Sequence, residues 1–305
     1  MLIKSRTVPR ELKIYQLLNS RKKLLENERK HLYTLQKGYE GEVLFDSMTS
    51  SIQTDCLILN DLLLPQNKNT FQIDSLIIIP EKIYLIEVKN FEGDYFYEHD
   101  RLYTRIPPES EVTNPLIQLN RSESLFRQLL QKLGYNVPIQ SIVVFVNPEF
   151  TLYQAPINKT FLYPGQINRF LQSFHSTSSR LENNHKTLAD QLKSLHIPDA
   201  PFYLPPSYQF DELRKGIPCF FCGAFGATTK GAYSYCVVCD KKERMDTRIL
   251  RSVDQFTILF PGLTITTKRI HDWSNGEFGK RVIRRVLQKH LSVKGIRKWS
   301  YYEFD

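Results

Sequence analysis

The sequence lacks any apolar run long enough to cross a membrane. The longest candidates, Leu76–Ile79 and Ile142–Val146, have the length of strands, whereas a spanning helix needs about 18–20 apolar residues. The first twenty residues also lack the uninterrupted apolar core of a signal peptide, because charged residues are spread through them. We therefore expect a cytoplasmic protein with no membrane partner.

The chain also lacks the composition of a disordered or coiled-coil protein. Charged residues make up only 24% of it, whereas hydrophobic residues make up 41% and aromatic residues 12%. We find no internal repeat of the kind that builds solenoids. Its 305 residues are enough for about two domains at roughly 100–200 residues each.

Acidic residues are scarce at both ends of the chain. Residues 1–37 hold ten Lys/Arg and three Asp/Glu, and residues 240–305 hold fifteen and eight, whereas the middle is mildly acidic and the net charge is +9. Basic segments attract polyanions through phosphate neutralisation and counterion release. Nucleic acid is therefore the expected partner of the two ends, and solvated helix surfaces are the alternative.

Cysteine is also rare, but four of the five cysteines form a pattern. Two CxxC pairs, Cys219/Cys222 and Cys236/Cys239, are separated by thirteen residues. This spacing is typical of a tetrahedral Zn²⁺ site with a hairpin between two knuckles. Disulfides are disfavoured in a reducing compartment, and a thioredoxin-like motif is disfavoured without a βαβ context. The fifth cysteine, Cys56, is expected to be a core thiol.

The zinc is expected to stabilise a segment too small to build a core of its own. Contact with nucleic acid is the functional alternative for this ribbon. It is favoured by four nearby cations, Lys230, Lys241, Lys242 and Arg244.

Hydrophobic periodicity predicts a helical start followed by an α/β domain. Residues 10–36 have a helical pattern, in which Ser20 could start a second helix, and Gly38 interrupts it before a helix resumes. The period then changes to two, which predicts an antiparallel meander of consecutive strands at 56–64, 71–80, 82–91 and 93–105. A helix over 114–134 that stops at Gly134 and a buried strand over 139–146 complete the pattern.

The sharpest constellation is Asp74 on one predicted strand and Glu87 and Lys89 on the next. A turn at Pro80-Glu81 would place Asp74 directly opposite Glu87, and strand alternation places Lys89 on the same face as Glu87. Two facing carboxylates repel unless a cation separates them or one is protonated. An exposed ladder of ion pairs is the alternative, but the apolar neighbours of these residues indicate central strands.

Phosphodiester hydrolysis is the chemistry that uses such a set. Mg²⁺ held by Asp74 and Glu87 can activate water, while the Lys89 ammonium orients the water or offsets charge on the transition state. Glu42 and Gln118 are the candidates to complete the site. Glu40 is an alternative third acid, and we favour Glu42.

A basic amphipathic helix is predicted over 276–291. Its apolar stripe leaves four cations elsewhere on the helix, and these are the candidate nucleic-acid-binding residues Lys280, Arg281, Arg284 and Arg285. Two cations and three aromatic residues follow closely and could add contacts: Arg297, Lys298, Trp299, Tyr301 and Tyr302. A docked helix with a solvated basic face is the alternative.

Four ordered motifs resemble a known family. GYEGE (38–42), FQIDSLII (71–78), YLIEVKNF (84–91) and NPLIQ (114–118) are similar in order and approximate spacing to the nuclease-related domain called NERD. That family is assigned to the PD-(D/E)XK nuclease superfamily. The resemblance covers about residues 38–155.

The resemblance implies a fold and a set of roles. The fold is α/β, with a restriction-endonuclease-like core in which helices flank a central mixed sheet. Gly38, Gly41 and Glu42 match the helix motif, Asp74 the metal-binding aspartate, Glu87 and Lys89 the acid-x-lysine pair, and Gln118 the glutamine of the following helix. Ile73 rather than Pro precedes Asp74, which is ordinary in this superfamily.

These inferences combine into one expected protein with five parts. A basic helical segment (1–37) precedes a NERD domain (38–175), a helical and Pro-rich linker (176–216), a zinc ribbon (217–242) and a basic C-terminal module (243–305). We expect an Mg²⁺-dependent nuclease acting on nucleic acid, with DNA as the expected substrate, and a structural Zn²⁺. A catalytically silent nuclease-like scaffold and a zinc-ribbon nucleic-acid-binding protein are the alternatives. The sequence identifies no protein partner.

Overall fold

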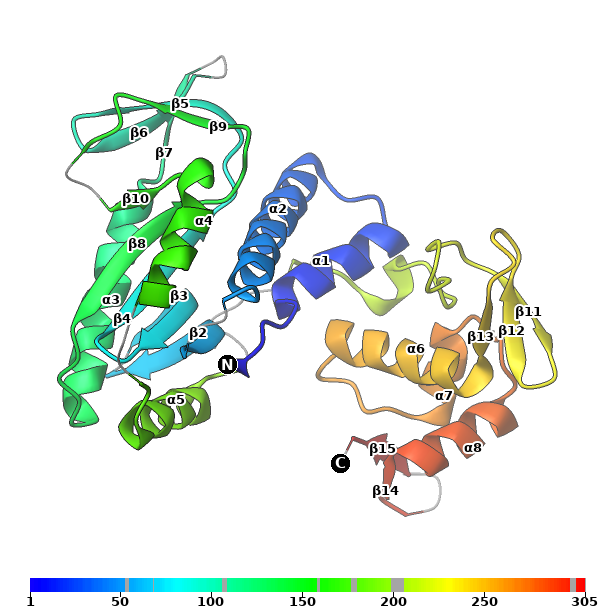
Figure 1. Ribbon diagram of the computed structural model, residues 1–305. Helices are drawn as coiled ribbons and strands as arrows, with labels where there is room; N and C mark the ends of the chain where they lie inside the picture. Colours follow the sequence, from blue (N-terminus) through cyan, green and yellow to red (C-terminus); the bar gives the residue numbers. More distant parts are fainter. Residues whose placement is uncertain are drawn as a thin grey trace. The chain divides into compact units, whose positions relative to one another are not determined.

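The computed structural model describes residues 1–52, 55–67, 69–105, 109–157, 160–176, 180–198, 206–296 and 300–304. The chain forms two compact units (Figure 1). Unit 1 consists of Met1–Val8 and Tyr33–Phe202, and unit 2 of Pro9–Leu32 and Tyr203–Asp305. The helices and strands are described below for each unit separately.

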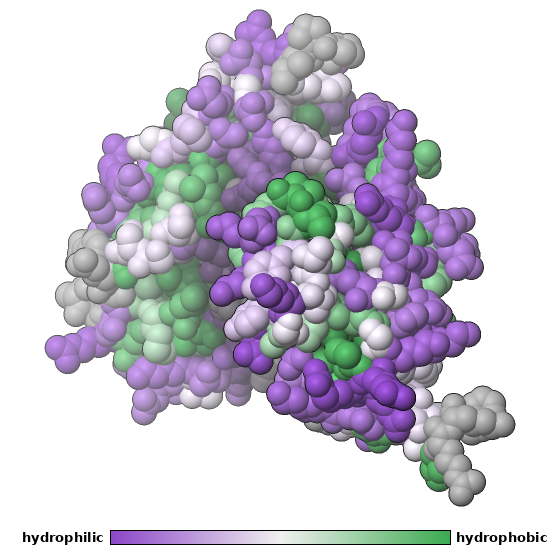
Figure 2. Space-filling view, turned by 90° about the vertical axis from the view of Figure 1, so that its right-hand side faces the viewer, coloured by the Kyte–Doolittle hydropathy of each residue, from purple (hydrophilic) through white to green (hydrophobic). Residues whose placement is uncertain are grey.

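The surface shown in Figure 2 is hydrophilic over much of its area, with hydrophobic areas between the charged and polar side chains. Single exposed apolar residues are normal on protein surfaces. Among the described residues, no helix combines the length and the apolar character that crossing a membrane requires.

Unit 1 is built on a six-stranded mixed sheet with the strand order β1-β2-β3-β4-β8-β10. Strands β2, β3 and β4 pair antiparallel, whereas β1 pairs parallel with β2, and β8 pairs parallel with β4 and β10. The strands are β1 (Leu2–Lys4), β2 (Leu57–Gln66), β3 (Asn69–Ile79), β4 (Lys82–Lys89), β8 (Ile139–Phe145) and β10 (Phe161–Leu162). The expectation of an α/β fold with a central mixed sheet is therefore confirmed.

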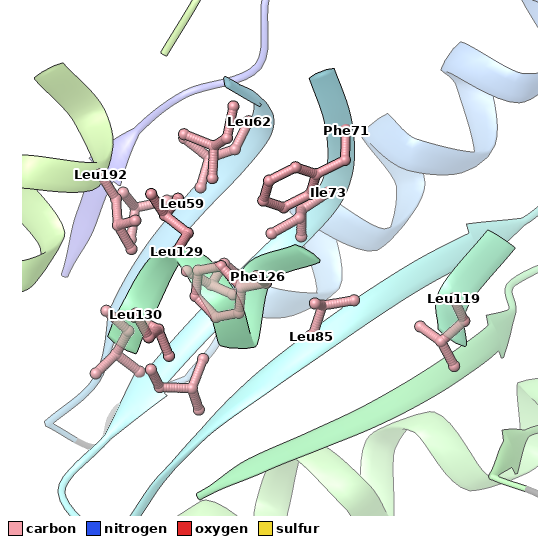
Figure 3. Close-up of a cluster of buried hydrophobic side chains, with 14 of the residues drawn as sticks. Leu59, Leu62, Phe71, Ile73, Leu85, Leu119, Phe126, Leu129, Leu130 and Leu192 are labelled. Carbon is pink, nitrogen blue, oxygen red and sulfur yellow. The ribbon is translucent and has the colours of Figure 1, made fainter. Parts of the chain in front are cut away.

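Helices cover both faces of this sheet. On one face, α3 (Pro115–Lys132) and α5 (Asn183–Leu195) pack against the strands, and the buried side chains of this layer are shown in Figure 3. Phe126 of α3 and Leu192 of α5 are fully buried there. On the other face, Phe45 of α2 (Glu26–Thr49) and Ile167 of α4 (Pro164–Gln172) pack against the sheet. Strands β3, β4 and β8 are apolar on both sides because both of their faces are covered.

The predicted four-strand meander is wrong in its last member. After β4 the chain leaves the central sheet and enters a second sheet with the order β7-β6-β5-β9. The predicted strand over 93–105 is a hairpin of β5 (Gly93–Glu98) and β6 (Arg101–Thr104), and its turn residues His99 and Asp100 have positive φ values of 49° and 60°. Strands β7 (Ser110–Val112) and β9 (Phe150–Tyr153) complete the second sheet.

The N-terminal region differs from the prediction in two details. Gly38 does not interrupt a helix, because α2 runs without a break from Glu26 to Thr49. The helical structure is interrupted earlier, between the end of α1 (Arg10–Arg21) and the start of α2 at Glu26. Residues 2–4, expected in a helical segment, form β1 at the edge of the central sheet. The five-part division as independent modules stays a prediction.

Unit 2 contains α1, α6 (Met245–Leu259), α7 (Thr267–Trp273) and α8 (Lys280–His290), with two small sheets. One sheet has the order β11-β12-β13, formed by β11 (Ala227–Lys230), β12 (Tyr233–Cys236) and β13 (Lys242–Arg244). The other pairs β14 (Ser292–Lys294) with β15 (Tyr301–Glu303). Residues 297–299, expected near the basic helix, lie outside the described residues.

Buried cations hold the elements of unit 2 together. The guanidinium carbon of Arg21 lies 3.9 Å from the centroid of the Trp273 ring, and Trp273 is fully buried. Arg248, only 2% exposed, donates through Nε to Glu277 at 2.6 Å and through Nη1 to Glu243 at 3.4 Å. These contacts connect α1 to α7, and α6 to β13 and to the segment after α7.

Candidate active site and metal centre

Asp74 and Glu87 lie on neighbouring antiparallel strands. In the register of β3 and β4, Ser75 is opposite Ile86, and continuing that register places Asp74 opposite Glu87. Strand alternation puts both carboxylates on the face with Leu76 and Leu85, which α3 covers. Asp74 is 5% exposed and Glu87 1% exposed, so the pair is buried. The expected pairing of the two acids across the hairpin agrees with this register.

Lys89 lies beside both acids on the same strand face as Glu87. Its Nζ forms an ion pair with the buried Glu87 Oε1, with 2.7 Å between the two atoms. One Asp74 oxygen, Oδ2, accepts from the Val88 backbone amide at 2.8 Å. Glu87 is therefore held by the Lys89 charge, and Asp74 by the Val88 amide.

Gln118 reaches the same place from the start of α3. Its Oε1 accepts from Lys89 Nζ at 3.2 Å. The helix begins after Asn114, whose side chain accepts from the Leu116 amide at 3.0 Å, and Pro115 fits the first turn, where no backbone donor is needed. This cap fixes the first turn of α3 and, with it, the position of Gln118.

Glu42 is held by α2, which approaches the end of β4 very closely. A Cβ added at Gly41 would lie 2.4 Å from Asn90 Cβ, so only glycine permits this approach. Asn90 Nδ2 donates to the Lys37 carbonyl at 2.8 Å, which holds the helix in place. By contrast, a Cβ at Gly38 would meet nothing within 4 Å. Glu40, the alternative third acid, is exposed and accepts from Gln36 Nε2 at 2.9 Å.

Arg6 is a central member of the site that the sequence did not indicate. Its guanidinium donates to Glu42 Oε2 at 2.5 Å, to both oxygens of Asp46 at 3.0 and 3.1 Å, and to the Asp74 carbonyl at 2.6 Å. Its side chain is only 3% exposed. Asp46, one helical turn after Glu42, was missed as well. Because Arg6 arrives from the segment after β1, no local pattern near the motifs could have indicated it.

The acids of this cluster are difficult to ionise together. Burial raises the pKa of Glu87 to about 8, and the Asp74 charge adds to the shift while Lys89 opposes it. Burial likewise raises the pKa of Glu42 to about 8, with Asp74 adding and Arg6 opposing. The pKa of Asp74 is also raised by burial, against the effects of Lys89 and the Val88 amide. An added cation would relieve this repulsion.

Glu42 does not join Asp74 and Glu87 in a tight group. A metal site of three or more residues needs ligand atoms that lie close together. Among the described residues, the four cysteines of unit 2 meet this condition, with ligand atoms within 4.8 Å of one another, and the three acids do not. The Glu42 carboxylate instead accepts from the Arg6 guanidinium. Asp74 and Glu87 are therefore the oxygen ligands that this cluster offers as a pair.

The four cysteines of unit 2 converge with the spacing of a metal site. The Sγ atoms of Cys219 and Cys239 lie 3.7 Å apart, and those of Cys222 and Cys236 lie 3.6 Å apart. Four sulfurs at about 2.3 Å from a tetrahedral zinc would be about 3.8 Å apart, whereas a disulfide requires about 2.05 Å. The cluster could therefore hold a metal ion such as zinc. Cys56 is a separate buried thiol.

Two similar turns carry these cysteines. In the first, the Gly223 amide donates to the Cys219 carbonyl at 3.0 Å, and in the second the Asp240 amide donates to the Cys236 carbonyl at 3.1 Å. Gly223 and Asp240 both have positive φ, at 71° and 53°. Backbone amides also point at sulfur, from Phe221 to Cys219 Sγ at 3.4 Å. The equivalent geometry of the two turns is typical of paired zinc knuckles.

The basic helix is present as α8. Ile283, Val286 and Leu287 form its buried stripe. The four predicted nucleic-acid-binding residues are all exposed on the remaining surface, at Lys280, Arg281, Arg284 and Arg285. They lie in unit 2, whereas the carboxylate cluster lies in unit 1.

Comparison with known proteins agrees with the four-motif resemblance. Residues 37–146 match the sequence profile of the nuclease-related domain, NERD. No curated protein matches the sequence. A solved structure, protein VC1899 from Vibrio cholerae, is 13% identical, with 57% of this chain and 37% of that chain covered and a TM-score of 0.23. This chain thus spans little more than a third of the length of that protein. The protein contains a nuclease-related domain at residues 37–146.

Proposed function

We propose that the protein is a metal-dependent nuclease that hydrolyses phosphodiester bonds in nucleic acid, with DNA as the substrate. The observation that carries this proposal is the buried pair Asp74 and Glu87 on adjacent strands, with Lys89 beside them. The pair lies within the nuclease-related domain. A restriction-endonuclease-like core of the PD-(D/E)XK superfamily is part of the same proposal.

The donor set fits a divalent cation. Glu87 Oε1 is buried with the Lys89 ammonium 2.7 Å away, and Asp74 has a second carboxylate oxygen beyond the one that accepts from Val88. Hard cations such as Mg²⁺ prefer oxygen ligands of this kind. Asp74 and Glu87 would hold Mg²⁺. When bound, the ion would acidify a water molecule and stabilise negative charge that develops on the phosphate.

The protein's own groups would then position and neutralise the reacting atoms. Opposing carboxylates more than offset the effect of burial on Lys89, so the pKa of its ammonium is raised and Lys89 stays charged. That ammonium can donate to the attacking water or to a phosphate oxygen. Gln118 Oε1 accepts from Lys89 Nζ and so orients it toward the two acids. Arg6 holds Glu42 near Asp74.

A catalytically silent scaffold is the second candidate, and Arg6 is the observation that favours it. Its guanidinium already neutralises Glu42 and Asp46, and it also binds the Asp74 carbonyl. A protein that uses this cation for structure has less need of a metal. The intact set of Asp74, Glu87 and Lys89 favours the enzyme.

The cysteine cluster and α8 have supporting roles in this proposal. Zn²⁺ held by Cys219, Cys222, Cys236 and Cys239 would stabilise the ribbon. The α8 cations would hold phosphates, so replacing Lys280, Arg281, Arg284 and Arg285 together with Gln should weaken binding to unrelated sequences. The slope of log affinity against log salt should become shallower by up to about 0.9 for each phosphate that the variant no longer neutralises. An unchanged affinity and slope would make α8 a docked structural element.

Cleavage assays test the enzymatic proposal. Linear duplex, circular and single-stranded DNA and RNA are incubated with the full chain and Mg²⁺, beside Asp74→Asn and Lys89→Met. The control is Asp94→Asn, an exposed acid of β5 in the same domain. We expect Mg²⁺-dependent cleavage by the native protein and the control, and a loss of at least about 100-fold in the two site variants. Nucleic-acid binding without cleavage by the native protein, at any divalent metal, would support the scaffold.

A further inference from the structure

The three-stranded sheet β11-β12-β13 has two chemically different faces. Ser234 and Cys236 of β12 are buried on the first face, and the register places Glu243 beside Ser234. Glu243 faces inward there, where its carboxylate accepts from Arg251 at 2.6 and 3.0 Å and from Arg248 at 3.4 Å. The Glu243 carboxylate is thus paired with arginines on the inner face of the sheet.

The second face joins two tyrosines with three cations. Tyr233 pairs with Lys230 of β11 on one side and with Arg244 of β13 on the other. Tyr235 is two residues along β12, on the same face, and pairs with Lys242. Lys242 Nζ lies 5.2 Å from the centroid of the Tyr233 ring. Both tyrosines are partly exposed, and the three cations are exposed.

This tyrosine face carries no acid. Its six positions, all described, hold only two hydroxylated rings, three cations and one threonine: Thr228, Lys230, Tyr233, Tyr235, Lys242 and Arg244. A charge of +3 on so small a surface favours an anionic ligand. The rings add a flat surface that a simple phosphate site does not need.

The last turn of α8 contacts the first turn of α6, which follows this sheet in the chain. Lys289 Nζ lies 3.9 Å from Asp246 Oδ2, and Asp246 follows the last strand residue, Arg244, by two positions. Both elements belong to unit 2.

We propose that the tyrosine face of β11-β12-β13 binds unpaired bases of nucleic acid, so that the protein recognises single-stranded stretches. Base stacking on aromatic rings combined with a cationic groove is how proteins bind single strands without sequence preference. In a duplex the faces of the bases are covered by their neighbours, so the rings would have nothing to stack on. The inference rests on the proposed nuclease function and names its substrate class, a nucleic acid with an unpaired stretch.

Substitutions of the two tyrosines by Leu and by Phe distinguish the loss of ring stacking from the loss of the hydroxyl group. Tyr233→Leu and Tyr235→Leu remove the rings, whereas Tyr233→Phe and Tyr235→Phe keep them, and Tyr153→Leu alters an exposed tyrosine of unit 1. Binding of the full chain to a labelled oligo-dT and to a hairpin duplex with the same number of phosphates is measured by fluorescence anisotropy, without Mg²⁺. Zinc content and thermal unfolding of each variant confirm that the ribbon is folded.

We expect tighter binding of oligo-dT than of the duplex, and a loss of about fivefold or more in oligo-dT affinity for each Leu variant. The Phe variants and Tyr153→Leu should bind as the native protein does. Changing Lys230, Lys242 and Arg244 to Gln should make the salt dependence of oligo-dT binding shallower by about 0.7 for each phosphate that these cations neutralise.

If the two oligonucleotides bind equally and the Leu variants have no effect, the inference is overturned. The cations of this face would then bind the phosphate backbone of a duplex. Binding of neither oligonucleotide would overturn the inference too, and would leave an acidic protein as the occupant. The proposed nuclease function fails on a different result, which is the absence of Mg²⁺-dependent cleavage. If the protein cleaves nucleic acid but the Leu variants bind oligo-dT as the native protein does, only the present inference is contradicted.

Discussion

Gly41 of α2 and Asn90 at the end of β4 approach so closely that a Cβ at residue 41 would lie 2.4 Å from Asn90 Cβ. This approach brings the helix that carries Glu42 to the strand that carries Glu87 and Lys89. Asn90 also donates to the Lys37 carbonyl, one helical turn earlier. A glycine one residue before the acid therefore sets the distance between two parts of the candidate active site.

Gly41→Ala should push α2 away from β4. The added methyl group has no flexible neighbour to displace, so we expect a loss of about 1–3 kcal/mol in the free energy of unfolding and reduced cleavage. Gly38→Ala is the matched control, because its Cβ would meet nothing within 4 Å. Removing a helix-interior glycine there should stabilise the protein by about 0.5–1 kcal/mol. Urea unfolding of both variants checks the prediction, and equal effects would contradict it.

Arg6→Gln should destabilise unit 1. It leaves Glu42 and Asp46 without their buried counter-charge, and removing one partner of a buried ion pair costs about 3–5 kcal/mol. The double variant Arg6→Gln/Asp46→Asn restores part of the charge balance and should regain part of the loss. Chemical denaturation of the three proteins measures the coupling. If the double variant is as unstable as the sum of its single changes, the proposed charge network does not exist.

The metal-free protein should become less stable as the pH rises from 5 to 8. The folded-state pKa values of Glu42 and Glu87 are raised from 4.5 to about 8, so the folded protein holds protons that the unfolded chain releases. Their contribution to stability is fully present below pH 4.5 and is lost as the pH rises through about 8. Denaturation at several pH values, beside Glu42→Gln and Glu87→Gln, measures this slope. The variants should show a flatter profile, and Mg²⁺ should restore stability at pH 8. If the pH dependence of the unfolding free energy is the same in the native protein and in both variants, Glu42 and Glu87 are not the groups responsible for it.

Zinc should be present at about one equivalent per chain in the reduced protein. Cys219→Ser and Cys239→Ser should lose it, whereas Cys56→Ala, at a thiol outside the cluster, should keep it. Chelation should unfold the segment that holds the four cysteines and spare the central sheet of unit 1, because the two belong to different units. Elemental analysis and limited proteolysis provide the measurements. The absence of zinc from freshly purified protein would remove this assignment.

Local sequence patterns predicted those parts of the structure that neighbouring residues determine. The turn at Pro80-Glu81 and the alternation of β3 and β4 predicted the register around Asp74 and Glu87. The hairpin between the two CxxC pairs and the end of α3 near Gly134, which has φ of 84°, followed from glycine and spacing. In each case the signal and the structure lie within about twenty residues of each other.

Contacts between distant segments could not be predicted in this way. Arg6 reaches Glu42 and Asp74 across 36 and 68 residues of chain, and nothing near its own position indicates either partner. Only three residues separate β4 from β5, a spacing typical of neighbouring strands, so the sequence did not show that the two belong to different sheets. Gly38 resembles a helix break, but the packing of Phe45 and other α2 side chains outweighs the roughly 1 kcal/mol cost of a helical glycine.

The central claim is that Asp74 and Glu87 together hold a divalent cation. Crystals soaked in Mn²⁺, an Mg²⁺ substitute with anomalous scattering, test it most directly, with Glu87→Gln crystals as the comparison. We predict an anomalous peak at about 2.0–2.3 Å from oxygens of both carboxylates in the native protein, and no such peak in Glu87→Gln. A native crystal in which Arg6 and Lys89 fill the site and no Mn²⁺ lies near Asp74 would contradict the account.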